Sequence, residues 1–258
     1  MINIHPTAIV SNNAKIGDNV SIGPFSIIYD DVEIGNNTSI ASHCVIYNGA
    51  RIGNNCKIYQ GVSISHIPQV SKIQDVHSFV SIGDDTVIHE FVTIHKASKE
   101  GGFTSIGKNV LLMAYSHIAH DVKIGDNCII VNAVQIGGHV QIDDWAIIGG
   151  STPIHQFCLV GKHAMVGAAF KVVKDVPPFV LAGEEPMRYI GLNSVGLKRR
   201  GFSSQQMETL KKIYKLIYDS SLNVSQAKDK IKELFPDEPL AKDVIDFIDR
   251  SKRGIIPR

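Results

Sequence analysis

The sequence predicts a mainly β protein, in which a parallel β-helix is followed by a small α-helical domain. Large aliphatic residues recur at every sixth position from Ile4 to Ile64 and, in the same phase and with one break, from Ile82 to Val172. The residue four places after each aliphatic is usually small or β-branched, and Gly and Asn are frequent between the two. Because six is not a multiple of the 3.6 residues of an α-helical turn, these repeats are short strands joined by turns.

Three such repeats form one 18-residue coil of a triangular prism, so residues i and i+18 lie one above the other, roughly 4.8 Å apart. The β-helix is assigned to residues 1–175, which gives about nine to ten coils. We expect the turns to use the tolerance of glycine and asparagine for positive φ. The residues concerned are Gly17, Gly35, Gly53, Gly83, Gly107, Gly125, Asn19, Asn37, Asn55 and Asn127.

Two stretches interrupt the repeat, near residues 65–81 and 95–105. Pro68 and Gln74 take inward positions in the first, and Glu100 takes the place of an aliphatic in the second. Both are predicted to leave the prism as loops, where binding groups often lie. The cysteines all fall four residues after an aliphatic and are therefore predicted to fill the core, rather than to bind metal or form disulfides. They are Cys44, Cys56, Cys128 and Cys158.

The repeats end at a proline-containing stretch, which we read as a connector over residues 176–190. Residues 191–258 form the predicted α-helical domain. There, Ser203 begins a capping-box-like SSQQ, and apolar residues at helical spacing follow it. Two more helices are expected at about residues 224–235 and 240–252.

Charge and hydropathy limit the partners and the compartment. The net charge of +1 argues against nucleic acid as a partner, although residues 196–258 alone carry a balance of +5 that could face an acidic partner. No run approaches 18 apolar residues, and the first ten residues have neither the basic region nor the apolar run of a signal peptide. We therefore expect a cytoplasmic protein that does not span a membrane.

The stacking rule gathers several polar residues along one edge of the prism. His120 shares a column with Gly138 and Gln156, His139 shares one with Asp121, and His155 adjoins Gln156. His120 is a candidate general base, Asp121 would stabilise its imidazolium, and the Gly138 N–H would face a developing oxyanion. Acyl transfer to a hydroxyl needs these parts. Zinc is the rival chemistry because His117 and His120 are three residues apart, but they belong to different columns.

Motifs along nearly the whole chain resemble one family, the UDP-N-acetylglucosamine O-acyltransferases that depend on acyl carrier protein and begin lipid A synthesis. The matching segments are HPTAIV (5–10), IGPF (22–25), SHIAHD (116–121), GGHV (137–140), IHQFC (154–158), DVPPF (175–179) and GLKRRGFS (196–203). The resemblance implies a left-handed coil and a homotrimer with its active site in the cleft between adjacent prisms. It also implies a 3-hydroxyacyl donor carried on the phosphopantetheine of acyl carrier protein, with no cofactor and no metal.

When the family's residue roles are carried over to the matching positions, the resemblance implies that His120, Asp121 and Gly138 are catalytic. Residues lining the cleft for the UDP-sugar are then Lys72, His117, His139, His155, Gln156, Asn193, Arg199 and Arg200. Ala168 matches a position that limits the depth of the acyl-chain pocket.

Two residues depart from the family pattern. Val70 stands where an Asp near the sugar is expected, and Val195 replaces an acidic residue near the ribose. A 3-amino UDP-sugar therefore stays open as the acceptor of an N-acyltransferase. Three more classes of protein stay open beside it: a coenzyme-A-dependent hexapeptide acyltransferase, a zinc-dependent enzyme like the β-helix carbonic anhydrases, and a non-enzymatic scaffold.

Overall fold

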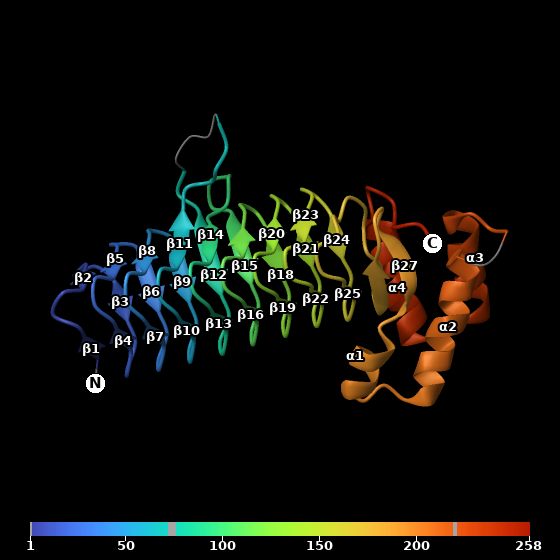
Figure 1. Ribbon diagram of the computed structural model, residues 1–258, viewed down its shortest axis with the longest axis horizontal. Helices are drawn as coiled ribbons and strands as arrows, with labels where there is room; N and C mark the ends of the chain where they lie inside the picture. The colour runs from blue at the N-terminus through green and yellow to red at the C-terminus, as the bar shows by residue number, and fades with distance from the viewer. Residues whose placement is uncertain (1, 72–75, 219–220) are drawn as a thin grey trace.

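A computed structural model describes residues 2–71, 76–218 and 221–258. Figure 1 shows an elongated prism of short strands with a group of helices at its C-terminal end. Two-residue strands follow one another at six-residue intervals, as the repeat predicts. Each strand pairs in parallel with the strand one coil later, usually 18 residues on, as Ser21 does with Ser39.

The strands of the prism form three sheets, numbered here in the order in which the chain meets them. Sheet 1 contains β1 (Asn3–Ile4), β4 (Ser21–Ile22), β7 (Ser39–Ile40), β10 (Lys57–Ile58), β13 (Val87–Ile88), β16 (Leu111–Leu112), β19 (Ile129–Ile130), β22 (Ile147–Ile148), β25 (Met165–Val166), β26 (Val180–Gly183) and β27 (Arg188–Leu192). Sheet 2 contains β2 (Ile9–Val10), β5 (Ile27–Ile28), β8 (Val45–Ile46), β11 (Ser63–His66), β14 (Thr93–His95), β17 (His117–Ile118), β20 (Gln135–Ile136) and β23 (Pro153–Ile154). Sheet 3 contains β3 (Lys15–Ile16), β6 (Val32–Ile34), β9 (Ala50–Ile52), β12 (Phe79–Ile82), β15 (Phe103–Ile106), β18 (Lys123–Ile124), β21 (Gln141–Ile142) and β24 (Leu159–Val160).

The core runs along the prism axis. The second residue of most strands and the residue four places later are buried, so each coil adds aliphatic side chains to a continuous apolar column. The four cysteines lie in this column as free, buried thiols, which confirms the prediction that they fill the core.

The glycines of the turns have a different role from the one expected. Asn19, Asn37, Asn55 and Asn127 adopt positive φ as predicted, but the six named glycines do not. A Cβ on Gly35 would lie 2.6 Å from the carbonyl carbon of Gly53 in the next coil. The expectation for glycine was wrong, because close stacking of coils, rather than an unusual φ, excludes a side chain at these positions.

Two loops leave the prism in the stretches that the sequence marks as interruptions. The first connects β11, which ends at His66, to β12, which begins at Phe79, and the second connects β14 to β15 between His95 and Phe103. In Figure 1 both rise from the same side of the prism. They emerge between sheet 2 and sheet 3, so they border one edge.

The segment read as a connector over residues 176–190 is more ordered than the sequence indicates. It contains β26 and the first part of β27, which pair antiparallel and continue sheet 1. Four helices follow: α1 (Ser194–Arg199), α2 (Ser204–Tyr218), α3 (Val224–Leu234) and α4 (Pro239–Arg250). Ser203 and Gln206 form the predicted capping box at the start of α2. Among the described helices, none has both the length and the apolar character that crossing a membrane requires.

Candidate active site

The 2–3 edge is defined here as the row of turns by which the chain leaves sheet 2 and enters sheet 3. It carries His120 and Asp121 after β17, Gly138 and His139 after β20, and His155 and Gln156 after β23. Three successive coils therefore present the residues that the sequence placed together. His120 Nδ1 lies 2.7 Å from Asp121 Oδ2, which leaves Nε2 directed away from the carboxylate.

Asp121 is held by more than the imidazole. Ser98, in the second extruded loop, donates its hydroxyl to Asp121 Oδ2 at 2.6 Å and its N–H to the same oxygen at 3.2 Å. Burial opposes ionisation of this carboxyl, but the hydrogen bonds from Ser98 and His120 outweigh it and keep the pKa of Asp121 below its ordinary value. A fixed anion therefore orients the His120 ring.

Gly138 packs against the other side of the His120 ring. A Cβ at this position would lie 2.8 Å from His120 Nε2 and 2.7 Å from Cε1, so no residue larger than glycine fits without moving the imidazole. Within the described residues, the N–H of Gly138 donates no hydrogen bond. The column thus combines an imidazole nitrogen with an unused backbone donor beside it.

A neighbouring edge shows why this donor is unused. In the turns from sheet 3 to sheet 1, an Asn or Asp of the next coil accepts the corresponding N–H, as Asp144 Oδ1 does from Asp126 at 2.8 Å. The same arrangement joins Asn36 to Asn54 at 2.8 Å. In the column of His120, the residue of the next coil is Gly138, which has no acceptor side chain. The next residue in the column is Gln156, and its side chain accepts no bond from Gly138 in the described part of the chain.

Two further histidines, His139 and His117, lie near His120 and Asp121. His139 Nε2 lies 3.8 Å from Asp121 Oδ2, and its ring meets the His120 ring edge-on at 5.1 Å. Burial lowers the pKa of His139 although Asp121 opposes this effect. His117 lies on β17 and contacts Thr93 Oγ1 at 2.8 Å, and burial together with His95 lowers its pKa to about 4. Both rings are therefore neutral at neutral pH.

His155 and Gln156 lie one coil beyond Gly138 and are exposed. His155 Nδ1 is 3.0 Å from the carbonyl oxygen of Gln156. They extend the polar row of the 2–3 edge toward the helical domain, without contacting His120.

The residues expected near the nucleotide lie elsewhere on the same chain. The 3–1 edge, formed by the turns from sheet 3 to sheet 1, carries Trp145 and His163, and Arg200 lies over the Trp145 ring at 5.2 Å. Asn193 caps α1, accepting from Gly196 and donating to the carbonyl of His163 at 3.0 Å. Burial lowers the pKa of the Arg200 guanidinium.

Arg199, at the end of α1, is exposed. Ala168 is exposed on the third edge, in the turn that follows β25 and leaves sheet 1. Within one chain, Ala168 does not share an edge with His120. The same is true of Arg200 and Asn193, which are called the Arg200 group below. Lys72 lies outside the described residues.

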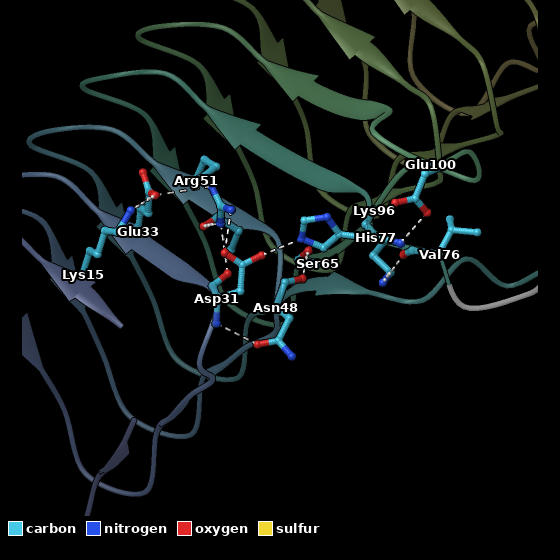
Figure 2. Close-up of polar contacts among 11 residues, drawn as sticks. Lys15, Asp31, Glu33, Asn48, Arg51, Ser65, Val76, His77, Lys96 and Glu100 are labelled. Carbon is cyan, nitrogen blue, oxygen red and sulfur yellow. Dashed lines mark hydrogen bonds and ion pairs between the residues drawn. The ribbon is translucent and has the colours of Figure 1, made fainter. Parts of the chain in front are cut away.

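Charged contacts fix the extruded loops above the 2–3 edge, as Figure 2 shows. Asp31 binds Arg51 Nη2 at 2.6 Å and His77 Nε2 at 3.2 Å. Glu100 of the second loop accepts the N–H of His77 at 3.0 Å, and Lys96 Nζ donates to the carbonyl of Val76 at 2.9 Å. The end of the first loop is thereby tied to both the prism and the second loop.

A metal ion has one candidate set of ligands in the described part of the chain. His120, Asp121 and His139 each offer one ligand atom, and these atoms lie within 4.8 Å of one another. This set differs from the His117 and His120 pair considered in the sequence, because His117 faces outward from sheet 2 and bonds to Thr93. The same three side chains suit proton transfer, so a bound metal would compete with it.

The sequence did not predict two residues at this site, Ser98 and Thr93. Ser98 lies in the second extruded loop, between β14 and β15, so the rule that stacks i on i+18 does not reach it. Thr93 was missed for another reason. It lies in phase, as an outward residue of β14, and polar outward residues are common on any strand.

The chain is similar to known proteins in both sequence and fold. Residues 175–256 match the family model described as UDP-N-acetylglucosamine O-acyltransferase, domain 2, and residues 13–48, 31–66 and 103–138 match bacterial transferase hexapeptide repeats. The UDP-N-acetylglucosamine acyltransferase of Francisella novicida is 42% identical, and its structure superposes with a TM-score of 0.96 over 99% of this chain and 94% of that one. The chain belongs to the UDP-N-acetylglucosamine acyltransferase family.

Other members of the UDP-N-acetylglucosamine acyltransferase family are similarly close. The Bacteroides fragilis enzyme is 42% identical, with a TM-score of 0.95 over 98% of this chain and 99% of that one. The acyl-[acyl-carrier-protein]–UDP-N-acetylglucosamine O-acyltransferase of Thiobacillus denitrificans is 42% identical over 105 residues, so the sequence match spans 41% of that relative's length and 41% of this chain. The predicted fold class, a left-handed parallel β-helix with C-terminal helices, is confirmed by these structures together with the repeats.

Proposed function

We propose that this protein transfers a 3-hydroxyacyl chain from acyl carrier protein to the 3-hydroxyl of UDP-N-acetylglucosamine, the first step of lipid A synthesis. The observation that carries the proposal is the close packing of Gly138 against His120 Nε2. The N–H of Gly138 donates no hydrogen bond within the described residues, and Asp121, held by Ser98, binds the other nitrogen of the ring. A general base next to an oxyanion donor is what acyl transfer to a hydroxyl requires.

The reaction can be followed atom by atom on these residues. His120 Nε2 accepts the proton of the acceptor hydroxyl as its oxygen attacks the thioester carbon, and the Gly138 N–H donates to the resulting oxyanion. Collapse of the intermediate breaks the carbon–sulfur bond. The imidazolium then returns its proton to the departing phosphopantetheine thiolate. Asp121 stabilises the imidazolium and keeps the Nδ1 proton in place.

The proposal includes a homotrimer. The outward side chains of the later strands of sheet 1 are apolar and half-exposed, whereas those of sheet 3 are mostly polar. The apolar series is Val87, Leu111, Ile129, Ile147, Met165 and Leu181. A second copy packed on this face would bury the series. It would also bring another edge toward the 2–3 edge, which supports a cleft shared between copies.

In such a cleft, Asn193, Arg199 and Arg200 of one copy would bind the diphosphate beside His120 of the next copy. His117, His139, His155 and Gln156 would line it, together with Lys72. Ala168 would limit the depth of the acyl-chain pocket. A donor on acyl carrier protein and a nucleotide-sugar acceptor place the reaction in the cytoplasm, with no cofactor beyond the donor's own phosphopantetheine.

For the acceptor substrate, a 3-amino UDP-sugar is the alternative to UDP-N-acetylglucosamine. Val70 lies on the first extruded loop and is 43% exposed, at the position where the family pattern has an Asp near the sugar. A 3-amino sugar would rely less on such an acidic contact, because an amine is the stronger nucleophile. The same base and oxyanion donor serve both acceptors.

A product assay separates these acceptors. Acyl-carrier-protein thioesters of several chain lengths are offered with UDP-N-acetylglucosamine or with its 3-amino analogue, and the products are identified by mass. The proposal expects an ester as the faster product. An amide formed faster would move the assignment to the N-acyltransferase, and transfer from coenzyme A at an equal rate would favour the coenzyme-A-dependent class.

A further inference from the structure

Beside the 2–3 edge lies a cavity that the proposed mechanism does not use. It has a volume of about 480 Å³ and is bounded by His139 and Phe157 of the edge, Gln141 and Leu159 of sheet 3, and the end of α4 with the segment that follows it. Arg250 is the last residue of α4, and Lys252 and Arg253 belong to the segment after it. Figure 1 shows the chain after α4 returning beside the last coils of the prism.

The cavity is cationic. Its lining contains three basic residues and no acidic one. Arg250 is neutralised because both its Nη atoms contact the Asp143 carboxylate. The other nearby carboxylate, Asp175, is buried and accepts from the N–H of Leu159 and the hydroxyl of Ser251. Lys252 and Arg253 form no ion pair within the described residues, so the ammonium and the guanidinium each carry a positive charge that no carboxylate contacts directly.

The anchoring of the segment fixes these charges in place. Arg253 donates Nε to the carbonyl of Val173 at 3.1 Å, and its backbone N–H donates to Asp175 at 3.3 Å. Asp175 pairs with Ile255 as an isolated parallel bridge. The segment is therefore held against the end of the prism, and the guanidinium is positioned before any ligand arrives.

The cavity adjoins the reacting groups through aromatic contacts. Phe157 stacks on the His139 ring at 4.7 Å, and His139 meets the His120 ring at 5.1 Å. A ligand with an anionic group in the cavity can thus extend along these rings to His120. Arg200, the cation expected near the nucleotide, lies on the 3–1 edge instead.

We propose that this cavity is a phosphate subsite, in which Lys252 and Arg253 bind a phosphate ester of a substrate whose other end reaches His120. An ammonium beside a guanidinium fork suits phosphate oxygens. The inference rests on the proposed function, in which two substrates carry such a group. One is the donor, through the phosphate of its phosphopantetheine arm, and the other is the nucleotide sugar, through its diphosphate.

Kinetics with donors that differ only in the phosphate test the subsite. Transfer is measured from acyl-4′-phosphopantetheine and from acyl-pantetheine, with Lys252→Gln as the variant and Lys15→Gln as the control. Lys15 is an exposed lysine of the first coil, and it pairs with Glu33 of the next coil. The control therefore makes the same charge change at the far end of the prism. For Lys252→Gln, the ratio of the two kcat/KM values falls about tenfold if the donor phosphate occupies the subsite, in line with the loss of a charged hydrogen bond.

Each other outcome has a defined meaning. If the KM for the nucleotide sugar rises about tenfold and the donor ratio is unchanged, the subsite stands and its occupant is the diphosphate. A donor ratio and a nucleotide KM that both match Lys15→Gln would overturn the inference. Arg253→Gln gives the independent second measurement.

Failure of the proposed function is recognised separately. It appears as absence of product in the unaltered protein with every donor and acceptor. In that case, calorimetric binding of 4′-phosphopantetheine, compared with pantetheine, still tests the subsite. Equal affinities for the two compounds in the unaltered protein would overturn it.

Discussion

At the scale of single residues, the candidate site is centred on the His120 imidazole, whose two nitrogens have different surroundings. Asp121 binds Nδ1 of His120, and Gly138 leaves no room for a side chain at Nε2. The sequence predicted this trio because all three residues obey the stacking rule. It could not predict Ser98, whose position depends on the path of a loop rather than on the repeat.

Ser98 is a positioning residue, and its removal tests that role. In Ser98→Ala, Asp121 loses the hydroxyl that holds it and can rotate away from His120, so kcat should fall about tenfold, which corresponds to roughly 1.4 kcal/mol. Ser98→Thr keeps the hydroxyl and should restore most of the rate. Steady-state kinetics with thermal unfolding distinguishes a positioning role from a structural one. A fall in kcat that Thr does not rescue, or one matched by a lower unfolding temperature, would contradict it.

The charge state of Asp121 gives a pH prediction. Its pKa lies below the ordinary value, so it stays ionised where histidines titrate. In Asp121→Asn the imidazolium that forms during transfer loses its anion, so kcat/KM should fall. Because the lowered pKa keeps the Asp121 carboxyl ionised, the loss should be present throughout roughly pH 5 to 9, where the rates of both proteins are measured. Equal kcat/KM values for the two proteins would mean that Asp121 does not act through His120.

At the scale of the repeated element, the six-residue phase predicted the strands, the inward cysteines and the two extruded loops. It failed where another constraint took over. The six named turn glycines were expected to allow positive φ, but the structure gives that conformation to the Asn two residues later in several of these turns, and the glycines instead allow close contact between coils. The hairpin of β26 and β27 was missed, because its residues have left the phase and its prolines resemble a linker.

The role of these glycines predicts a stability difference. A Cβ in Gly35→Ala would lie within 3 Å of the backbone of Gly53 and Asn54, so the free energy of unfolding should fall by about 1–3 kcal/mol. Gly183→Ala is the matched control, because its nearest contact would be 3.6 Å away. Urea denaturation of both variants measures the difference. Equal stability of the two would contradict the stacking explanation.

At the scale of the whole molecule, the residues assigned to one reaction lie on three edges of one prism. His120 is on the 2–3 edge, the Arg200 group is on the 3–1 edge, and Ala168 is on the turn after β25. Residues 48 apart, such as His120 and Ala168, differ by a fractional number of coils and so cannot share an edge. One chain therefore does not bring these residues together, which is why the proposed function includes a site shared between copies.

Mixed oligomers test that sharing. His120→Ala and Arg200→Ala are each expected to be poorly active, since each removes one side of every site. When the two are co-expressed in equal amounts, random trimers should recover about a quarter of the normal sites, because some clefts receive both intact residues. Activity per purified trimer, with mixing verified by distinct affinity tags, is the readout. No recovery in verified mixed trimers would place both residues in the same chain's site.

The measurement that addresses the central claim most directly is turnover of His120→Ala with an acyl-carrier-protein thioester and UDP-N-acetylglucosamine. The side chain lies on the edge of the prism, 18% exposed, and outside the apolar column, so the fold should persist. Loss of a general base predicts a kcat lower by about 10²- to 10⁴-fold, with unchanged circular dichroism. A folded His120→Ala protein that turns over near the normal rate would contradict the account.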